Sequence, residues 1–340
     1  DMAAALEEMK WLPLMKRSWK ARLILLRVVL RTAFGKLTGR RYVVAGAALQ
    51  GRMLKACLDA GVESRPDAPV SELLLVDGAV RGVRTHIGGK PRTVGAELGV
   101  LVNSGGFALN AEMRAQYQPG ASTEWSNSPE GDTGEMIQEM LRLGAAAAQM
   151  EEFVGYQATL PPGREPGRMI PGVQGMTASP HAILVDSTGV RYMNEGGSYM
   201  AYCQGMLERN KTVPAVPSWA VVDSQYMARY MFAGTMPGTD KPQAWYDDGY
   251  LKKADSIEAL AGEMGVDPAL LQSTVKRFNG FVAAGKDDDF QRGARAYDNW
   301  LGDPLHQPIQ TLGTIEQAPF YAVHVVPGDV GTFGGVLTDE

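Results

Sequence analysis

The sequence predicts an α/β protein of two domains, and three features of its 340 residues carry that prediction. The run LGVLVN at 98–103 is short and nearly continuously apolar, as expected of a buried parallel strand. It leads directly into Ser104-Gly105-Gly106, whose glycines would let a ligand approach the backbone at the carboxyl end of that strand. The region 155–180 is rich in Pro and Gly and indicates a crossing into a second domain of mixed strands and helices.

The bulk composition is that of an ordinary globular protein. The chain is 45% hydrophobic and 21% charged, and its formal net charge of −5 gives no general reason to expect a nucleic-acid partner. Cys57 and Cys203 form no CxxC pattern, so reduced thiols in a cytoplasmic protein are expected rather than a disulfide framework. The 4 histidines are scattered, and no metal site is predicted. No apolar run reaches the ~18 residues of a membrane span, and no signal peptide is visible.

The N-terminal part is strongly basic. Residues 10–41 hold ten Lys or Arg, and no acid lies between Glu8 and Asp59. Within this part, 19–34 has the pattern of an amphipathic helix with Arg residues between apolar ones. The pattern fits a weak contact with a membrane surface, or a helix packed on its own protein with a basic outer face. We favour the second alternative, because the sequence shows no second anchoring signal.

Local signals predict a strand, a helix and a hairpin in the segment that follows. The apolar residues 42–44 are expected to end a strand, and the i, i+4 spacing over 49–57 predicts a helix. Asp77-Gly78 stands between two apolar runs, which is a strong signal for a β-hairpin.

The second domain is predicted to mix strands with a helical hairpin. HAILVD (181–186) and SWAVVD (218–223) are predicted strands. Two helices are predicted within 254–285, with N-caps at Asp255 and Asp267. The acidic KDDDF that follows them is expected to be a solvated loop.

Two segments rich in glycine and aromatic residues are the candidates for chemistry. One is RYMNEGGSYM (191–200), and the other is PFYAVHVVPGDVGTFGG (319–335). Such turns can accept a flat ring or a carbonyl without obstruction by side chains. Tight turns between strands would also explain both patterns, and from the pattern alone we slightly favour that interpretation.

The ordered series of motifs resembles the FAD-dependent 3-ketosteroid dehydrogenases, within the wider fumarate reductase/succinate dehydrogenase flavoprotein family. The series includes APVSELLLVDGAVRGV, VNSGGFALN, GDTGEMI, GVRYMNEGGSYM and APFYAVHVVPGDVGTFGGVLTDE, and it covers roughly residues 40–340. The resemblance implies a Rossmann-type FAD-binding domain, incomplete here, interrupted by a mixed α+β substrate-capping domain. It implies boundaries of 1–155 for the first part of the FAD-binding domain, 156–312 for the capping domain and 313–340 for the return.

The resemblance also implies which residues bind the cofactor. Val70 matches a backbone position beside the adenine, and Asp132 matches the family's G-D-G segment, although Thr133 replaces its second glycine. The remaining positions fall in two glycine turns near the phosphates, ribose and flavin. The first turn consists of Ser104, Gly105 and Gly106, and the second of Thr332, Gly334 and Gly335.

Tyr199 is the implied catalytic residue. Fumarate reductases carry Arg at this position, four residues after the acid of the Asn-Glu pair, whereas ketosteroid dehydrogenases carry Tyr. The resemblance therefore implies that Tyr199 abstracts the proton from carbon 2 of a 3-ketosteroid while hydride passes from carbon 1 to flavin N5. A 3-ketosteroid 4,5-dehydrogenase, a reductase like fumarate reductase and an inactive truncated flavoprotein module remain alternatives.

Several family segments are not found in these 340 residues. The N-terminal G-x-G-x-x-G unit and the C-terminal Y-P-G-x-G segment are not seen, and both ends of the sequence look cut. We therefore expect this fragment to bind FAD poorly and to be inactive alone. The implied partners are a steroid substrate and an external electron acceptor.

Overall fold

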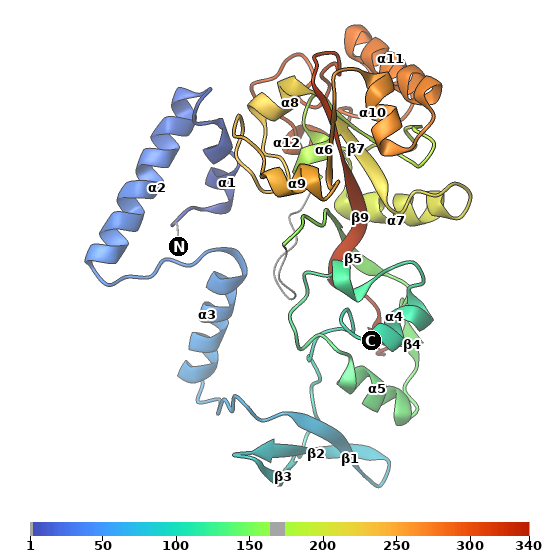
Figure 1. Cartoon of the computed structure of the whole chain (residues 1–340). Helices are drawn as coiled ribbons and strands as arrows, with labels where there is room; N and C mark the ends of the chain where they lie inside the picture. Colours follow the sequence, from blue (N-terminus) through green and yellow to red (C-terminus); the bar gives the residue numbers. More distant parts are fainter. Residues whose placement is uncertain (1–2, 164–173, 340) are drawn as a thin grey trace. The chain divides into compact units, whose positions relative to one another are not determined.

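The structure, a computed structural model, describes residues 3–163 and 174–339. They fall into two compact units, one of residues 1–69 with 85–92 and one of 70–84 with 93–340. Helices span Leu6–Met9 (α1), Trp19–Leu37 (α2), Ala45–Asp59 (α3), Ala111–Tyr117 (α4), Glu135–Arg142 (α5), Gln174–Ala178 (α6), Tyr199–Asn210 (α7), Ser224–Arg229 (α8), Gln243–Asp247 (α9), Ile257–Met264 (α10), Pro268–Ala284 (α11) and Ala296–Leu301 (α12), with 3-10 turns at Leu12–Leu14 (η1) and Thr123–Trp125 (η2) (Figure 1). Strands span Val70–Val76 (β1), Ala79–Ile87 (β2), Lys90–Gly95 (β3), Ala147–Ala148 (β4), Phe153–Ala158 (β5), Ala182–Val185 (β6), Ser218–Val222 (β7), Leu251–Ala254 (β8), Phe320–Thr332 (β9) and Gly335–Val336 (β10).

The first unit is helical. The amphipathic helix predicted over 19–34 is confirmed as α2, which begins where the Ser18 hydroxyl accepts a hydrogen bond from the backbone of Ala21. Residues at a spacing of seven, among them Ala21 and Val28, are buried along one face of α2. An ion pair of 2.8 Å between Arg31 and Glu8 attaches α1 to this helix.

The helix predicted over 49–57 is confirmed as α3, but the strand expected at 42–44 is wrong. The structure gives this segment no regular secondary structure. The ring of Tyr42 instead lies so close to Gly35 of α2 that a side chain at Gly35 would collide with it. A strand requires a hydrogen-bonded neighbour, which an apolar triplet cannot predict.

The β-hairpin predicted at Asp77-Gly78 is confirmed. Strands β1, β2 and β3 form a sheet in that order. Asp77 and Gly78 have φ values of 52° and 76°, the left-handed pair that matches the twist of a two-residue hairpin.

The buried parallel strand predicted at 98–103 is wrong. The segment has no regular secondary structure, and the side chains of Leu98 and Leu101 are 103% and 94% exposed. A parallel strand is stable only between neighbouring strands and beneath helices. Within residues 3–163 and 174–339, no strand is paired with 98–103, so this apolar run has nothing to pack against.

The second unit is built on a five-stranded antiparallel sheet in the order β5-β9-β7-β6, with β8 also paired to β9. The predicted strands at 181–186 and 218–223 are confirmed as β6 and β7. Figure 1 shows the long strand β9 running from the level of β7 to the level of β5. The chain leaves β5 at Ala158 and returns to β9 at Phe320. Because these two strands are paired, the two ends of the intervening segment 159–319 lie side by side. The predicted domain boundaries at 155/156 and 312/313 stay predictions.

Alternate residues of the strands fill two hydrophobic layers. In β6, Leu184 faces a core with residues of α7, α8 and α9, and Ile183 faces a core with residues of α10 and α11. The period of two along the strand therefore places helices on both faces of the sheet. A smaller apolar cluster, with Phe107 at its centre, joins α4 to α5.

The helical hairpin α10–α11 forms with one of its two predicted caps. Asp267 accepts hydrogen bonds from the backbone of the first turn of α11, as predicted. The N-cap of α10 is Ser256 rather than Asp255, since the Ser256 hydroxyl accepts the hydrogen bond from Ala259.

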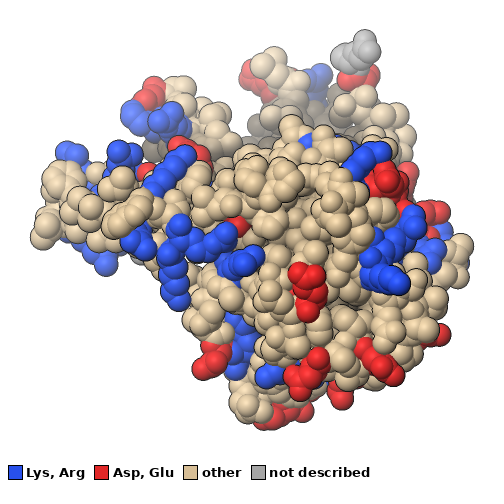
Figure 2. Space-filling view, turned by 90° about the horizontal axis from the view of Figure 1, so that it is seen from above, with Lys and Arg blue, Asp and Glu red and all other residues tan. Residues whose placement is uncertain are grey.

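Charges of both signs lie on the surface. Figure 2 shows Lys and Arg side chains standing among Asp, Glu and uncharged residues on the face turned toward the viewer. Across the described part of the chain, the helices are too short or too polar to span a bilayer.

Candidate functional site

Three segments that are far apart in the sequence meet at the predicted cofactor residues. The backbone N–H of Gly106 donates to the carboxylate of Asp132, and the N–H of Phe107 donates to Thr332 Oγ1 at 3.1 Å. Leu109 N–H donates to the backbone oxygen of Asp132 at 2.9 Å. The structure therefore gathers residues 105–107, 132 and 332 into one hydrogen-bonded set.

The glycines of this set are required by its packing. Gly105 has φ of 85°, a left-handed conformation that favours glycine. A side chain at Gly105 would collide with the Asp132 carboxylate, and one at Gly106 would collide with the Thr332 hydroxyl. The backbone of Ser104 and Gly105 is exposed on the outside of the turn, where a ligand can reach it.

The return turn after β9 is also closely packed. A side chain at Gly334 would collide with the backbone of Gln149 and Met150, so glycine is needed there. Gly335 pairs with Ala148 in the β10–β4 ladder. The Ser128 hydroxyl is buried beside this turn without a hydrogen-bond partner in the described structure.

Val70 belongs to a different element from the residues of this set. It is the first residue of β1 and is 36% exposed. The hydrogen bonds that join Gly106 to Asp132 and Phe107 to Thr332 do not involve Val70. The role of Val70 beside the adenine stays a prediction, as do the roles of the other cofactor residues.

Tyr199 opens helix α7, and Ser198 is the N-cap. The half-buried ring of Tyr199 lies 6.5 Å, centroid to centroid, from the ring of Tyr156 on β5. Burial raises the pKa of Tyr156, so that hydroxyl stays protonated at neutral pH. The ring of the predicted catalytic residue Tyr199 thus lies near the ring of Tyr156, which no sequence motif indicated.

The segment that leads to Tyr199 is held by a buried ionic network. Glu195 is fully buried and accepts hydrogen bonds from Arg191 Nε at 2.9 and 3.0 Å and from Arg292 Nη1 at 2.9 Å. Arg191 also pairs with Asp287 at 2.6 Å. The acid of the Asn-Glu pair is therefore engaged by two guanidinium groups, and the catalytic role of Tyr199 stays a prediction.

Asp287 corrects the prediction of a solvated KDDDF loop. Asp287 is 1% exposed. Its neighbours Lys286 and Asp288 are exposed and form an ion pair of 2.6 Å with each other. An acidic run looks uniformly solvated in sequence, since its partner Arg191 stands almost a hundred residues away. The turn at 287–292 instead directs one of its three carboxylates inward.

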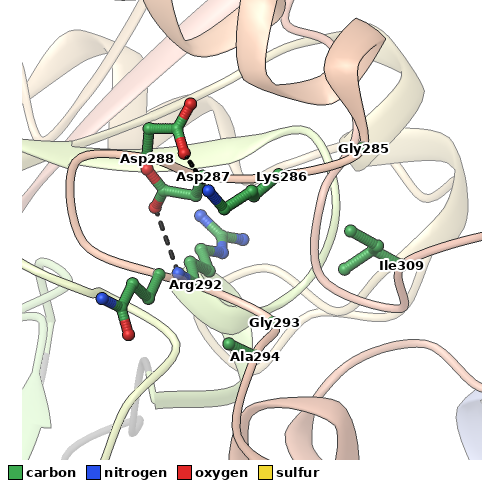
Figure 3. A pocket seen from close by; sticks show the side chains of 9 residues that line it. Gly285, Lys286, Asp287, Asp288, Arg292, Gly293, Ala294 and Ile309 are labelled. Atoms are coloured by element: carbon green, nitrogen blue, oxygen red, sulfur yellow. Dashed lines mark hydrogen bonds and ion pairs between the residues drawn. The ribbon is translucent and has the colours of Figure 1, made fainter.

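Two cavities lie near this network. The larger, of about 420 Å³, is lined by residues 285–288 and 291–294 with Ile309, and the smaller, of about 170 Å³, adjoins it beside His181 and His306. Figure 3 shows the ion pair of Lys286 with Asp288 at its rim, and Asp287 accepting from the backbone of Arg292. Neither cavity is lined by Tyr199 or by the predicted cofactor residues, so they do not mark the candidate site.

Comparison with known proteins assigns the family. The model of the FAD binding domain matches residues 3–340. The chain belongs to the FAD-binding domain family. FAD is therefore the cofactor that the family assigns, as the sequence predicted. Groups of three or more His, Cys, Asp or Glu that could hold a metal ion are absent from the described residues.

Individual relatives of this FAD-binding chain act on cyclic ketones, according to their names. It is 37% identical to a 3-oxosteroid 1-dehydrogenase of Mycolicibacterium smegmatis, over 96% of this chain and 58% of that protein. It is 33% identical to a 4-oxocyclohex-2-ene-1-carboxylate 5-dehydrogenase of Sinomonas cyclohexanicum, over 95% of this chain and 56% of that protein. A 3-ketosteroid delta1-dehydrogenase from Sterolibacterium denitrificans, solved with 1,4-androstadiene-3,17-dione, matches with a TM-score of 0.88 and 28% identity, covering 98% and 61% of the two chains. The chain thus spans little more than half the length of these relatives.

The residues present fit a bound FAD. Ser104 and Gly105 are exposed, so a ligand can reach this glycine turn, and the buried Ser128 hydroxyl beside the return turn has no hydrogen-bond partner in the described structure. Backbone N–H groups in such glycine turns are suited to phosphate and ring oxygens.

Proposed function

We propose that the protein is a flavin-dependent oxidoreductase that introduces a double bond into the ring of a 3-ketosteroid, with Tyr199 as the proton-abstracting group. The observation that carries the proposal is the position of Tyr199. It opens α7, which packs against β5, and β5 pairs with the part of β9 that leads to Thr332. Helix α7, which begins at Tyr199, therefore packs against the strands that lead to the predicted flavin turn at Thr332.

The proposed chemistry requires a base for the proton beside the ketone. The phenol of Tyr199 takes the proton from carbon 2, and it is most effective as a phenolate. FAD, when bound, accepts the hydride from carbon 1, and the reaction also needs an external electron acceptor.

A ketone suits this site better than a dicarboxylate. Tyrosine stands where fumarate reductases carry the Arg that donates a proton. The relatives named for 3-oxosteroids and oxocyclohexene carboxylates are dehydrogenases of cyclic ketones, which supports removal of hydrogen beside a carbonyl. A 4,5-dehydrogenase is the nearest alternative, because the position of the new double bond depends on how the steroid lies.

The test is anaerobic bleaching of the flavin in the full-length gene product. We expect 4-androstene-3,17-dione to bleach the flavin, and fumarate not to reoxidise it. This steroid already has a 4,5 double bond, so its oxidation would favour the 1,2 reaction over the 4,5 reaction. Bleaching only by a 4,5-saturated ketosteroid would support the alternative, and rapid reoxidation by fumarate would overturn the proposal.

Tyr199→Phe tests the assigned base. We expect this variant to keep its flavin and to lose at least about 100-fold in kcat, the usual range for a lost general base. Tyr321→Phe is the matched control, because Tyr321 lies at the opposite end of β9 from Thr332. Near-normal turnover by Tyr199→Phe would refute the assignment.

We also propose that α2 contacts an anionic membrane surface, in place of the alternative favoured from the sequence, because apolar residues of this helix are exposed. Six of its apolar residues recur at spacings of three and four and are each more than half exposed, so they form one stripe along the helix. They are Trp19, Leu23, Leu26, Leu30, Phe34 and Leu37.

Basic residues flank this apolar stripe on both sides. At 100° per residue, Lys20 and Arg27 fall on one side and Arg22 and Lys36 on the other, while the buried residues of α2 fall opposite the stripe. This is the arrangement of helices that lie in the interface plane, and each base near an anionic surface adds about 1 kcal/mol.

Sedimentation with lipid vesicles tests the contact. We expect the protein to bind vesicles with about 30% phosphatidylserine and to bind neutral ones less, since the bases contribute to the attraction. Leu26→Glu with Leu30→Glu should abolish binding, whereas Leu270→Glu on the exposed side of α11 should not. A wild-type protein that stays in the supernatant, or that hides this stripe in a dimer, would contradict the proposal.

A further inference from the structure

A buried ion pair joins the two turns assigned to the cofactor. Arg114 on α4 pairs through Nη2 with the carboxylate of Asp329 on β9, and their side chains are 2% and 0% exposed. The two residues are 215 positions apart in sequence. Arg114 lies in α4, the helix that follows the 104–107 turn, and Asp329 precedes Thr332 by three residues.

Asp329 shapes the return turn. Its carboxylate also accepts from Ser126 Oγ at 2.6 Å and from the backbone N–H of Gly331. Gly331 has φ of 150°, in the region that favours glycine. The carboxylate therefore fixes the backbone immediately before Thr332, whose hydroxyl accepts from the N–H of Phe107.

Arg114 fixes helix α4, which follows the first glycine turn. Its Nη1 donates to Gln118 Oε1 at 2.5 Å, and the Gln118 amide donates to the backbone oxygens of Met150 and Glu152 at 2.9 and 3.0 Å. Asn110, the N-cap of α4, donates through Nδ2 to the backbone oxygen of Thr133 at 2.9 Å. Helix α4 is thus attached both to the segment that carries Asp132 and to the residues beside β5.

We propose that Arg114 and Asp329 are positioning residues for FAD, which hold Gly106 and Thr332 at the separation the cofactor requires. This inference rests on the assignment of FAD that the proposed function also uses. Neither side chain is exposed to a ligand, so the pair acts only through the two turns.

The geometry argues that the pair does more than stabilise the fold. Arg114 Nε is buried without a hydrogen-bond partner in the described structure, and an unsatisfied buried donor lowers the net contribution of the pair to stability. Replacing a buried ion pair by apolar residues is often neutral for stability, and in some proteins such a pair serves instead to fix one geometry. In metal sites, residues that hold the ligating groups from behind alter metal affinity or activity about 10- to 100-fold when they are replaced, and we expect an effect at the lower end of that range here.

The test measures FAD affinity in the full-length gene product with Asp329→Asn and with Arg114→Met. We expect each variant to raise the FAD dissociation constant at least about 10-fold, which corresponds to about 1.4 kcal/mol. Asp186→Asn is the matched control, because Asp186 is fully buried and pairs with Arg209 at 2.7 Å away from these turns. Each affinity is measured below the melting temperature of the variant, which is recorded separately.

The outcomes separate positioning from stability. The control should lose thermal stability as the test variants do, yet keep its FAD dissociation constant within about threefold of wild type. Asp329→Asn with unchanged FAD affinity and a lowered melting temperature would overturn the inference, and so would a control that weakens FAD binding equally. Steroid turnover does not enter the readout, so a wild-type protein that binds FAD but oxidises no ketosteroid would refute the proposed function and leave this inference standing. A wild-type protein that retains no flavin would refute both.

Discussion

Replacing Glu195 with Gln tests how the segment that carries Tyr199 is held. The fully buried carboxylate of Glu195 accepts hydrogen bonds from Arg191 and Arg292. Glu195→Gln keeps the volume and one acceptor oxygen but removes the negative charge. Arg292, whose side chain is itself fully buried, then loses its anionic partner at 2.9 Å.

The structure sets the expected magnitude. Removing one partner of a buried ion pair costs about 3–5 kcal/mol, because the other charge stays buried without compensation. Here Asp287 still neutralises Arg191, and three backbone carbonyls still accept hydrogen bonds from Arg292. We therefore expect the lower end, about 3 kcal/mol, which corresponds to a fall of about 6–12 °C in Tm for a domain of this size.

Urea unfolding followed by tryptophan fluorescence measures this loss, since Trp219 and Trp245 are buried on either side of the five-stranded sheet. Glu208→Gln, on the helix that Tyr199 opens, is the control, because the Glu208 side chain is 73% exposed in its pair with Lys211. The control should change the free energy of unfolding by less than about 1 kcal/mol. A Glu195→Gln variant within that same limit would refute the network as the anchor of the Tyr199 segment.

Three further predictions concern single groups. Burial lowers the pKa of the His181 imidazole in the folded protein below its unfolded-state value of about 6.5. The contribution of neutral His181 to the free energy of unfolding is therefore present above about pH 6.5 and is lost as the pH falls through the folded-state pKa. His181→Asn should flatten the dependence of the free energy of unfolding on pH between about 7 and 5, measured by urea titration. Gly106→Ala should weaken FAD binding at least about 10-fold in a fluorescence titration because its methyl group collides with the return turn, whereas Gly131→Ala, with open space around it, should not. Asp287→Asn should cost about 3 kcal/mol in thermal unfolding, and exposed Asp288→Asn less than about 1 kcal/mol; equal effects would contradict the inward placement of Asp287.

Features set by neighbouring residues were predictable from the sequence. Asp77-Gly78 supplies the two left-handed residues of its turn, and Asp267 caps α11 with its own side chain. The strand pattern in 181–186 was correct, since residues on both faces are apolar and both faces are covered. Ser256 was missed as a cap because Asp255 offered the same chemistry one residue earlier.

Features that depend on distant partners were not predictable. The apolar run at 98–103 carries the composition of a buried strand, yet composition cannot supply the neighbouring strands. The ion pair of Arg114 with Asp329 joins two segments with nothing in either to indicate the other. The meeting of Gly106, Asp132 and Thr332 could be expected only from resemblance to a family.

The charges around Tyr199 bear on the choice of substrate. The segment that carries it contains Arg191, and the network behind it contains Arg292, which are the kinds of group that could bind a dicarboxylate. Both guanidinium groups already face carboxylates, those of Glu195 and Asp287, and all four side chains are at most 4% exposed. Two cations and two anions leave the network electrically neutral. Moving either Arg toward a substrate would leave a buried carboxylate without its cationic partner. The network therefore anchors the segment without offering it a positive charge, which favours a neutral ketone beside the phenol of Tyr199.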